Sequence, residues 1–220
     1  MTCGSETLKP RPVFFGAGRV YDRRMTEPAA PQKSRAKPPR RISAQSLENS
    51  AVYYLQRYDS TAENLRRVLT RKVRRAAMHP EATVDAAEAA TWIAAVVAKM
   101  RRLGYVDDTR TATAKARGLL AKGAPPATIR RHLTLAGAGE DAIAAALAEL
   151  TGDTRTETDL TRTAAVTLAR RKRLGPYRAE ADRPDRRQKD MATLARAGFD
   201  FETARRVIDA PDVETLEEEP

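Results

Sequence analysis

The residues of this chain with the clearest chemical use are its clustered arginines. A guanidinium group keeps its charge at physiological pH and presents a planar fork of N–H donors that matches carboxylate and phosphate oxygens. Four clusters of basic residues are the candidate binding residues: Arg66, Arg67, Arg130, Arg131, Arg170, Arg171, Lys172, Arg173, Arg186 and Arg187. The chemistry they offer is the recognition of negative charge on a protein or a nucleic acid.

Each cluster taken alone also fits an ordinary solvated surface. Residues 170–173 occupy four successive positions, and at about 100° each they cover most of a helix circumference, so they do not all face one partner. Arg186 and Arg187 lie near an expected helix start, where the helix dipole disfavours positive charge. The recurrence of such clusters along the chain favours a long acidic or polyanionic target.

Other groups that could do chemistry are sparse. His79 and His132 lie far apart in the sequence, and neither is near Cys3, the only cysteine. The sequence contains no Gly-rich phosphate loop, no His-x-x-x-His helix and no nucleophile elbow. The adjacent acids Asp107 and Asp108 are explained by helix capping, because carboxylates accept hydrogen bonds from the free N–H groups at a helix start. We therefore expect no enzymatic activity, no metal site and no cofactor.

Composition indicates the same kind of partner. The chain has 40 Lys and Arg against 29 Asp and Glu, a formal net charge of +11, which attracts nucleic acids, acidic protein surfaces and anionic membranes alike. A single cysteine excludes an intrachain disulfide and favours a reducing cytoplasm. The most apolar segment, residues 86–98, is shorter than the ~20 residues that span a bilayer, and the start does not read as a secretory signal. We expect a cytoplasmic protein without a membrane partner.

The spacing of apolar residues predicts an all-α fold. From residue 43 onward apolar side chains recur at intervals of three and four, as in amphipathic helices. Aromatic residues make up only 5% of the chain, so we expect helices that pack closely around small side chains. The expected helices end at glycine or proline signals: His79-Pro80, Gly104, Gly123, Gly137, Gly175-Pro176, Gly198 and Pro211.

Internal similarity divides these helices into three units. Segment 63–69 aligns without gaps with 127–133, and this superimposes two of the arginine pairs. Segment 133–147 aligns in turn with 194–208, and a period of roughly fifty residues signals a repeat architecture. We predict an elongated, curved array of three tandem three-helix units at 43–104, 105–153 and 159–210, between a disordered basic arm at 1–42 and a disordered acidic tail at 211–220.

Three motifs also carry a family resemblance. They are Leu103-Gly104-Tyr105 followed by Asp107-Asp108, then Leu120 with Gly123, and finally Leu194-Ala195-Arg196-Ala197-Gly198-Phe199. In order and spacing they resemble the RecX family of recombinase regulators, over residues 43–209. Thr111 and Lys115 depart from the family's pattern, which usually has aromatic residues at these positions, so the helix after Asp108 has an altered face.

The resemblance implies a fold of tandem three-helix units and a function. Members of this family regulate RecA, so the chain is expected to bind the RecA–single-stranded DNA filament and to modulate, most often inhibit, its recombinase, ATPase and coprotease activities. Those activities belong to DNA repair, DNA recombination and the SOS response. The expected partner is therefore the RecA filament, with single-stranded DNA as a further candidate, and the expected state is a monomer.

Two other functions stay open. A helical DNA-binding module that acts independently of RecA fits the tight glycine turns and the positive charge, although no helix shows a base-reading set free of core positions. A helical scaffold for an acidic protein is the third candidate. Salt dependence separates them, because direct phosphate binding weakens steeply as salt rises.

Overall fold

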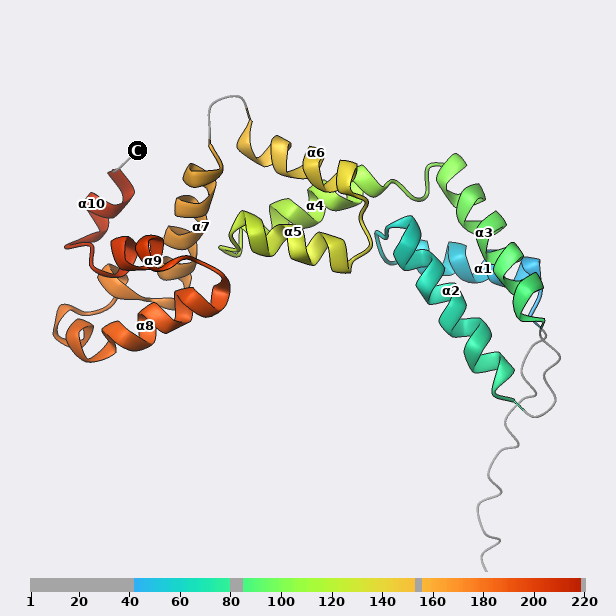
Figure 1. Ribbon diagram of the computed structural model, residues 1–220, viewed down its shortest axis with the longest axis horizontal. Coiled ribbons are helices and arrows are strands. Elements are labelled where there is room, and N and C mark those ends of the chain that lie inside the picture. The colour runs from blue at the N-terminus through green and yellow to red at the C-terminus, as the bar shows by residue number, and fades with distance from the viewer. Residues whose placement is uncertain (1–41, 80–84, 153–155, 219–220) are drawn as a thin grey trace, which may run out of the picture. The chain divides into compact units, whose positions relative to one another are not determined.

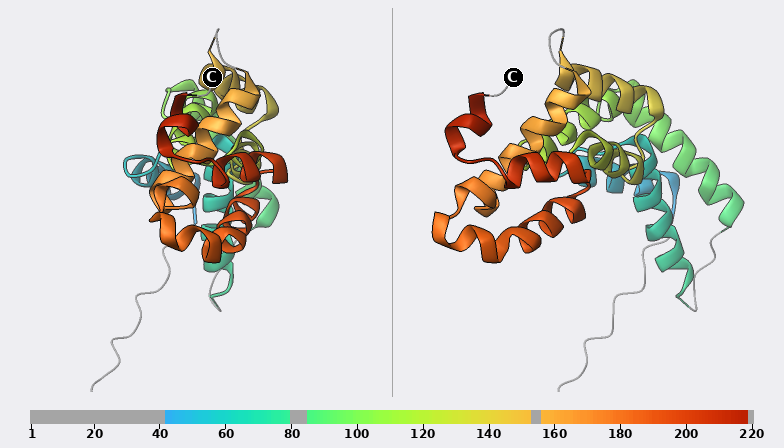
Figure 2. Two further views of the ribbon diagram at one scale, coloured as in Figure 1. Left: turned by 90° about the vertical axis from the view of Figure 1, so that its left-hand side faces the viewer. Right: turned by 60° about the vertical axis from the view of Figure 1, so that its left-hand side comes forward.

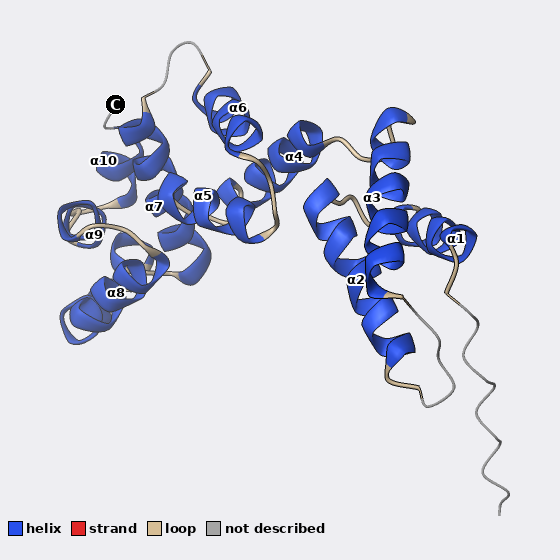
Figure 3. Cartoon of the chain, turned by 45° about the vertical axis from the view of Figure 1, so that its right-hand side comes forward, coloured by secondary structure: helices blue, strands red, loops and turns tan. Residues whose placement is uncertain are grey.

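The computed structural model of the chain describes residues 42–79, 85–152 and 156–218. Within these ranges the regular structure is entirely helical, which confirms the all-α prediction (Figure 1 and Figure 3). The basic arm at 1–42, which we expect to be disordered, lies outside the described residues except for Ile42, which packs against the buried cluster that contains Leu47. The buried apolar side chains of the described residues fall into three clusters, a grouping consistent with three successive units.

The first unit consists of α1 (Ala44–Leu55), α2 (Ala62–Ala77) and α3 (Ala86–Arg102). Capping explains where these helices begin, because Ser43, Thr61 and Asp85 each accept a hydrogen bond from a backbone N–H of the first turn. The three helices share one core, and its fully buried large side chains are Leu47, Leu65, Leu69 and Met100.

Gly104 ends α3 in the left-handed conformation, with a φ of 73°. The N–H of Tyr105 donates to the carbonyl of Met100 at 3.0 Å, which is the hydrogen bond of a Schellman motif. The predicted helix end is therefore confirmed. The apolar contact behind the turn comes from Val106, which is buried, whereas Tyr105 is exposed.

The second unit consists of α4 (Asp108–Leu120), α5 (Pro126–Leu135) and α6 (Glu140–Thr151). Asp107 caps α4 by accepting from the N–H of Arg110 at 2.9 Å. Asp108 does more than stabilise the first turn of α4, because its Oδ1 accepts from the N–H of Ala62 at 2.8 Å, at the start of α2. One acidic pair thus caps two helices of different units. The core of this unit is built from Ala112, Ala116, Ile129, Leu133, Ala138, Ala142, Ile143 and Ala146.

The third unit consists of α7 (Glu157–Lys172), two short 3-10 turns (Gly175–Tyr177 and Glu180–Asp182), α8 (Arg183–Ala197) and α9 (Phe201–Ile208). Helices α8 and α9 lie side by side (Figure 2). Helix α7 ends two residues earlier than predicted. Arg173 takes the left-handed conformation at φ 54°, and the N–H of Leu174 donates to the carbonyl of Ala169 at 2.9 Å. An arginine therefore occupies the position at which Gly104 and Gly198 end other helices.

The C-terminal segment differs from the expected disordered tail, because residues Val213–Glu218 form a helix, α10. Its anchor is Leu216, which is only 2% exposed and belongs to the core of the third unit. The carboxylate of Glu217 accepts from the Tyr177 hydroxyl at 2.7 Å. The acidic residues around Leu216 suggest a solvated tail, but this one leucine is buried and holds the helix in place.

Successive units meet at joints of similar construction. The Thr61 hydroxyl donates to the carbonyl of Ala136 at 2.6 Å, and the Thr128 hydroxyl donates to the carbonyl of Ala197 at 3.0 Å. Both acceptors directly precede a left-handed glycine at the end of a helix. Each joint therefore closes the end of one unit's middle helix onto the start of the preceding unit's middle helix.

Candidate partner-binding surface

Both arginines of the first pair are exposed on α2, whose buried residues are Leu65, Leu69 and Val73. Both guanidinium groups reach Glu63, with Arg67 Nε 3.0 Å from Glu63 Oε1. The hydrogen bond from Arg66 is the largest cause that lowers the pKa of Glu63, and Arg67 adds to it. This pair therefore already binds one carboxylate.

Arg67 also makes a contact between units, because its Nη1 donates to the carbonyl of Leu135 at 2.8 Å. The second pair lies on α5 and is held differently. Arg130 Nη1 lies 2.8 Å from Glu140 Oε1, on the exposed surface of the second unit. Arg131 is exposed, and its side chain forms no ion pair or hydrogen bond with another described residue. The two arginine pairs, Arg66–Arg67 and Arg130–Arg131, are aligned in sequence but have different contacts in the structure.

The basic run at the end of α7 is divided among several tasks. Arg170 lies 3.9 Å from Glu217 of α10, and Arg171 donates to the carbonyl of Lys122 at 2.6 Å, at the end of α4. Arg173 ends the helix with its positive φ. Among the described residues, Lys172 is exposed without an ion pair. The run therefore faces several directions, as the helical geometry predicts.

The cluster at the start of α8 has structural partners that account for its position. Arg187 forms a two-pronged contact with Asp209, at 2.7 and 2.6 Å. Hydrogen bonding from Arg187 is the main cause that lowers the pKa of Asp209. Arg183 donates to the carbonyls of Pro176 and Pro211 at 2.9 and 2.7 Å. Of the three arginines Arg183, Arg186 and Arg187, Arg186 alone is exposed with no such partner among the described residues.

A groove between α2 and α3 brings together cations that the sequence clusters did not include. Its volume is ≈ 690 Å³. The residues that line it are Glu63, Arg66, Arg67, Thr70, Arg71, Val73, Arg74, Ala86, Ala89, Ala90, Ile93 and Ala94. Arg67, Arg71 and Arg74 follow one another at intervals of four and three, a helical spacing that could have identified this face from the sequence. We call this feature the α2–α3 groove.

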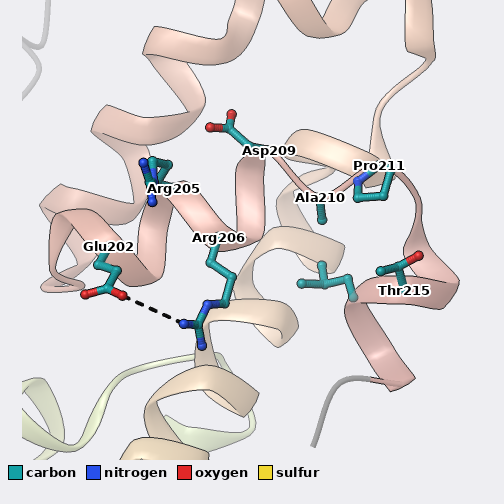
Figure 4. Close-up of a pocket in the computed structure, with 8 residues that line it drawn as sticks. Glu202, Arg205, Arg206, Asp209, Ala210, Pro211 and Thr215 are labelled. Carbon is teal, nitrogen blue, oxygen red and sulfur yellow. Dashed lines mark ion pairs between the residues drawn. The ribbon is translucent and has the colours of Figure 1, made fainter.

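A smaller pocket of ≈ 330 Å³ lies between α9 and α10 (Figure 4). The ion pair of Glu202 with Arg206, 3.7 Å long, lies along one side, and Thr215 of α10 lies on the other (Figure 4). Three of its charged lining residues, Glu202, Arg206 and Asp209, already have charged partners inside the chain, so we assign it no ligand.

Two further features are absent from the described residues. No group of three or more His, Cys, Asp or Glu side chains there has a geometry that could hold a metal ion. None of the described helices combines the length and the apolar character that crossing a membrane requires.

Relatives of the chain are found among characterised proteins, although no protein-family model matches it. A protein from Myxococcus xanthus (strain DK1622), named regulatory protein RecX, is 39% identical over 175 residues, which cover 79% of this chain and 90% of that protein. A regulatory protein RecX from Leuconostoc citreum (strain KM20) is 35% identical over 129 residues, covering 57% of this chain and 45% of that protein.

A solved structure supports the fold. The crystal structure of a regulatory protein RecX superimposes with a TM-score of 0.50 at 22% identity, covering 76% of this chain and 72% of the other. That likeness concerns the helical fold alone. The family assignment rests on the Myxococcus protein, which is matched over 90% of its length at 39% identity. The resemblance expected from the three sequence motifs is thereby confirmed, and the chain belongs to the RecX family of regulatory proteins.

Proposed function

We propose that this chain binds the RecA–single-stranded DNA filament and restrains its recombinase, ATPase and coprotease activities in DNA repair and the SOS response. The observation that carries the proposal is kinship with a regulatory protein RecX over most of the chain. Exposed cations on three helices support it, because Arg131, Lys172 and Arg186 form no ion pair with another described residue. These groups are available to an acidic partner.

The proposed mechanism is mechanical obstruction without catalysis by this chain. Three successive units, each with its own core, contact successive protomers along the filament groove, and the cations meet acidic protein surface or exposed phosphate. Such contact blocks entry into the groove or hinders the protomer movements that accompany ATP turnover. The chain then acts as a monomer in the cytoplasm.

The test is RecA's DNA-dependent ATPase, titrated with this protein. Arg131→Glu with Arg186→Glu reverses two exposed charges that have no described partner, so folding is preserved. Charge reversal at an interface replaces attraction with repulsion, and we expect inhibition to need about tenfold more of the variant, equivalent to about 1.4 kcal/mol. Unchanged ATPase and strand exchange at a micromolar excess of the wild-type protein would overturn the proposal.

The same two proteins, wild type and variant, also test the DNA-binding alternative in a binding assay. A module that acts without RecA binds bare single-stranded DNA with a steep salt dependence, and its charge-reversed variant shows a shallower slope. It also leaves RecA-dependent activity untouched in wild type and variant alike. Binding to nucleotide-bound filaments that exceeds binding to bare DNA is the result expected here.

A further inference from the structure

The α2–α3 groove has two unlike walls. Helices α2 and α3 lie side by side and run in opposite directions (Figure 1 and Figure 3). The α2 wall carries four guanidinium groups, and the α3 wall carries the methyl groups of Ala86, Ala90 and Ala94. The floor is closed, because Ala89 and Ile93 are only 1% and 5% exposed. A ligand in this groove therefore meets cations on one side and small apolar groups on the other.

The cationic wall already binds a carboxylate at one end only. Glu63 is held by Arg66 and Arg67. Arg71 and Arg74, which lie one and two turns further along α2, form no ion pair with another described residue. Successive turns of a helix are about 5.4 Å apart. Carboxylates spaced by one helical turn on a ligand would therefore meet Arg71 and Arg74 in sequence.

The alanine wall sets the shape of the ligand. Alanine side chains allow a neighbouring helix axis to approach to about 8 Å, the short end of the usual range. A helix at that distance places small residues against Ala86, Ala90 and Ala94 and its acidic side against the arginines. A nucleic acid strand would use the arginine wall alone, because the methyl groups offer its phosphates nothing. The two walls together fit an amphipathic helix.

Part of the groove is formed by helix length that the second unit lacks. Helix α2 has 16 residues and α3 has 17, whereas their counterparts α5 and α6 have 10 and 12. The alignment of 63–69 with 127–133 places the end of α5, Leu135, at Arg71. The residues of α2 beyond Arg71 thus have no counterpart in the second unit, and they include an exposed, unpaired arginine of the groove, Arg74.

We propose that the α2–α3 groove is a docking site for an acidic amphipathic helix of a partner protein. Glu or Asp at every fourth residue faces Arg71 and Arg74, and Ala, Ser or Gly on the adjoining face contacts the alanine wall. The chain's own segments fit poorly: residues 1–42 are rich in Lys and Arg, and the acidic α10 is anchored by Leu216 in the third unit. The inference goes beyond the proposed function, since it does not require that the partner be RecA.

The probe is an alanine-based helical peptide with Glu at every fourth position, labelled and titrated with the full-length protein by fluorescence anisotropy. A second peptide has the same composition with its Glu residues spread around the helix, and an oligothymidylate of equal charge represents nucleic acid. We expect the one-faced peptide to bind about tenfold more tightly than the spread one, because only it aligns carboxylates with both free arginines.

Matched variants locate the site. Arg74→Glu and Arg75→Glu make the same charge change in the last turn of α2, but only Arg74 lines the groove. Ala90→Glu and Ala95→Glu do the same for α3, where both residues are exposed and only Ala90 lines the groove. We expect the two groove variants to lose about tenfold in peptide affinity and the two controls to change it less than about twofold. Circular dichroism melts check that each variant folds.

Several results would overturn the proposal. Equal losses for Arg74→Glu and Arg75→Glu, or equal binding of the two peptides, would show attraction by net charge alone. Preferential binding of oligothymidylate that Arg74→Glu weakens and Ala90→Glu does not would assign the wall to nucleic acid. If Arg74→Glu does not fold, the comparison of Ala90→Glu with Ala95→Glu tests the docking site by itself. Peptide binding without RecA inhibition would contradict the proposed function but not the docking site in the groove. RecA inhibition that is unaltered in Ala90→Glu, together with no peptide binding, would contradict the docking site but not the proposed function.

Discussion

The guanidinium of Arg67 donates a 2.8 Å hydrogen bond to the main-chain carbonyl of Leu135, in the last turn of a helix 68 residues further along the chain. The last carbonyls of a helix lack an intrahelical donor, so this arginine satisfies a group that the helix leaves open. Arg171 donates to the carbonyl of Lys122 at 2.6 Å, in the turn that follows α4. Two of the candidate binding arginines therefore hold neighbouring units together.

Arg67→Met is expected to lower stability more than Arg66→Met. Arg67 loses a charge-assisted hydrogen bond to a helix end, which contributes about 1.5 kcal/mol, whereas Arg66 loses only an exposed contact with Glu63, which contributes about 0.5 kcal/mol or less. Urea unfolding of both variants measures the difference. Equal midpoints would show that the contact between units adds nothing in solution.

Gly123→Ala is expected to cost more than Gly104→Ala, although both glycines have a positive φ. A Cβ on Gly104 meets nothing within 4 Å, so only backbone strain of about 1 kcal/mol applies. A Cβ on Gly123 lies 2.7 Å from the backbone N of Leu168 and 2.8 Å from the carbonyl O of Ala164, and such overpacking adds about 1–3 kcal/mol. Thermal melts compare the two.

Two further variants at Gly104 test whether backbone strain explains the glycine at this helix end. Gly104→Asn should cost less than Gly104→Val, because Asn tolerates the left-handed region and a β-branched residue does not. If both cost the same, strain at this helix end is not what glycine relieves.

Arg173→Gly is expected to stabilise the protein by about 0.5–1 kcal/mol. Arg173 is the one non-glycine residue of the described chain with a positive φ, at 54°, and glycine removes the strain of that conformation. Lys172→Gly is the matched control, since it places glycine at the last helical residue of α7, where a helical conformation is needed, and should destabilise. A lower unfolding midpoint for Arg173→Gly would mean that the arginine side chain has a structural contact stronger than its backbone strain.

Asp209→Asn is expected to weaken the pH dependence of stability in acid. Hydrogen bonding from Arg187 lowers the folded-state pKa of Asp209 below its unfolded value of about 3.9. The stabilisation from a lowered pKa is present above the unfolded value and is lost as the pH falls through the folded value. The gap in unfolding free energy between wild type and variant should therefore be constant near neutral pH and shrink below about pH 4.

Denaturant unfolding at a series of pH values gives that gap directly. Both side chains are partly exposed, at 45% for Arg187 and 39% for Asp209, so added salt should narrow the gap at neutral pH. A gap that persists unchanged into strong acid would show that the ion pair does not form in solution.

Much of the fold was predictable because its signals are local. The stripe on α2 that buries Leu65, Leu69 and Val73, and the stop at Gly104, depend on residues within one or two helical turns. The same holds for the caps at Ser43 and Asp107. Two expectations remain untested predictions: the absence of an enzyme site and the curvature of the array.

The roles of the individual arginines were not predictable, because they depend on atoms distant in sequence. Nothing near Arg187 indicates Asp209, and nothing near Arg183 indicates the carbonyl of Pro211, 28 residues away. The helix at residues 213–218 was missed for a similar reason, since Leu216 is isolated among acids and gains its burial from the core of the third unit. Charge clusters predict that a surface binds anions, but not whether the anion belongs to a partner or to the chain itself.

The separation of the buried side chains into three clusters, each from consecutive helices, also bears on how the chain is made. Contacts that are close in sequence give a low contact order, and helical proteins of this kind fold in microseconds to milliseconds. Ribosomes add about 5–20 residues per second. The first unit can therefore assemble its core seconds before the residues of the third have been synthesised, and the hydroxyl contacts of Thr61 and Thr128 can then dock each new helix end onto a unit that is already formed.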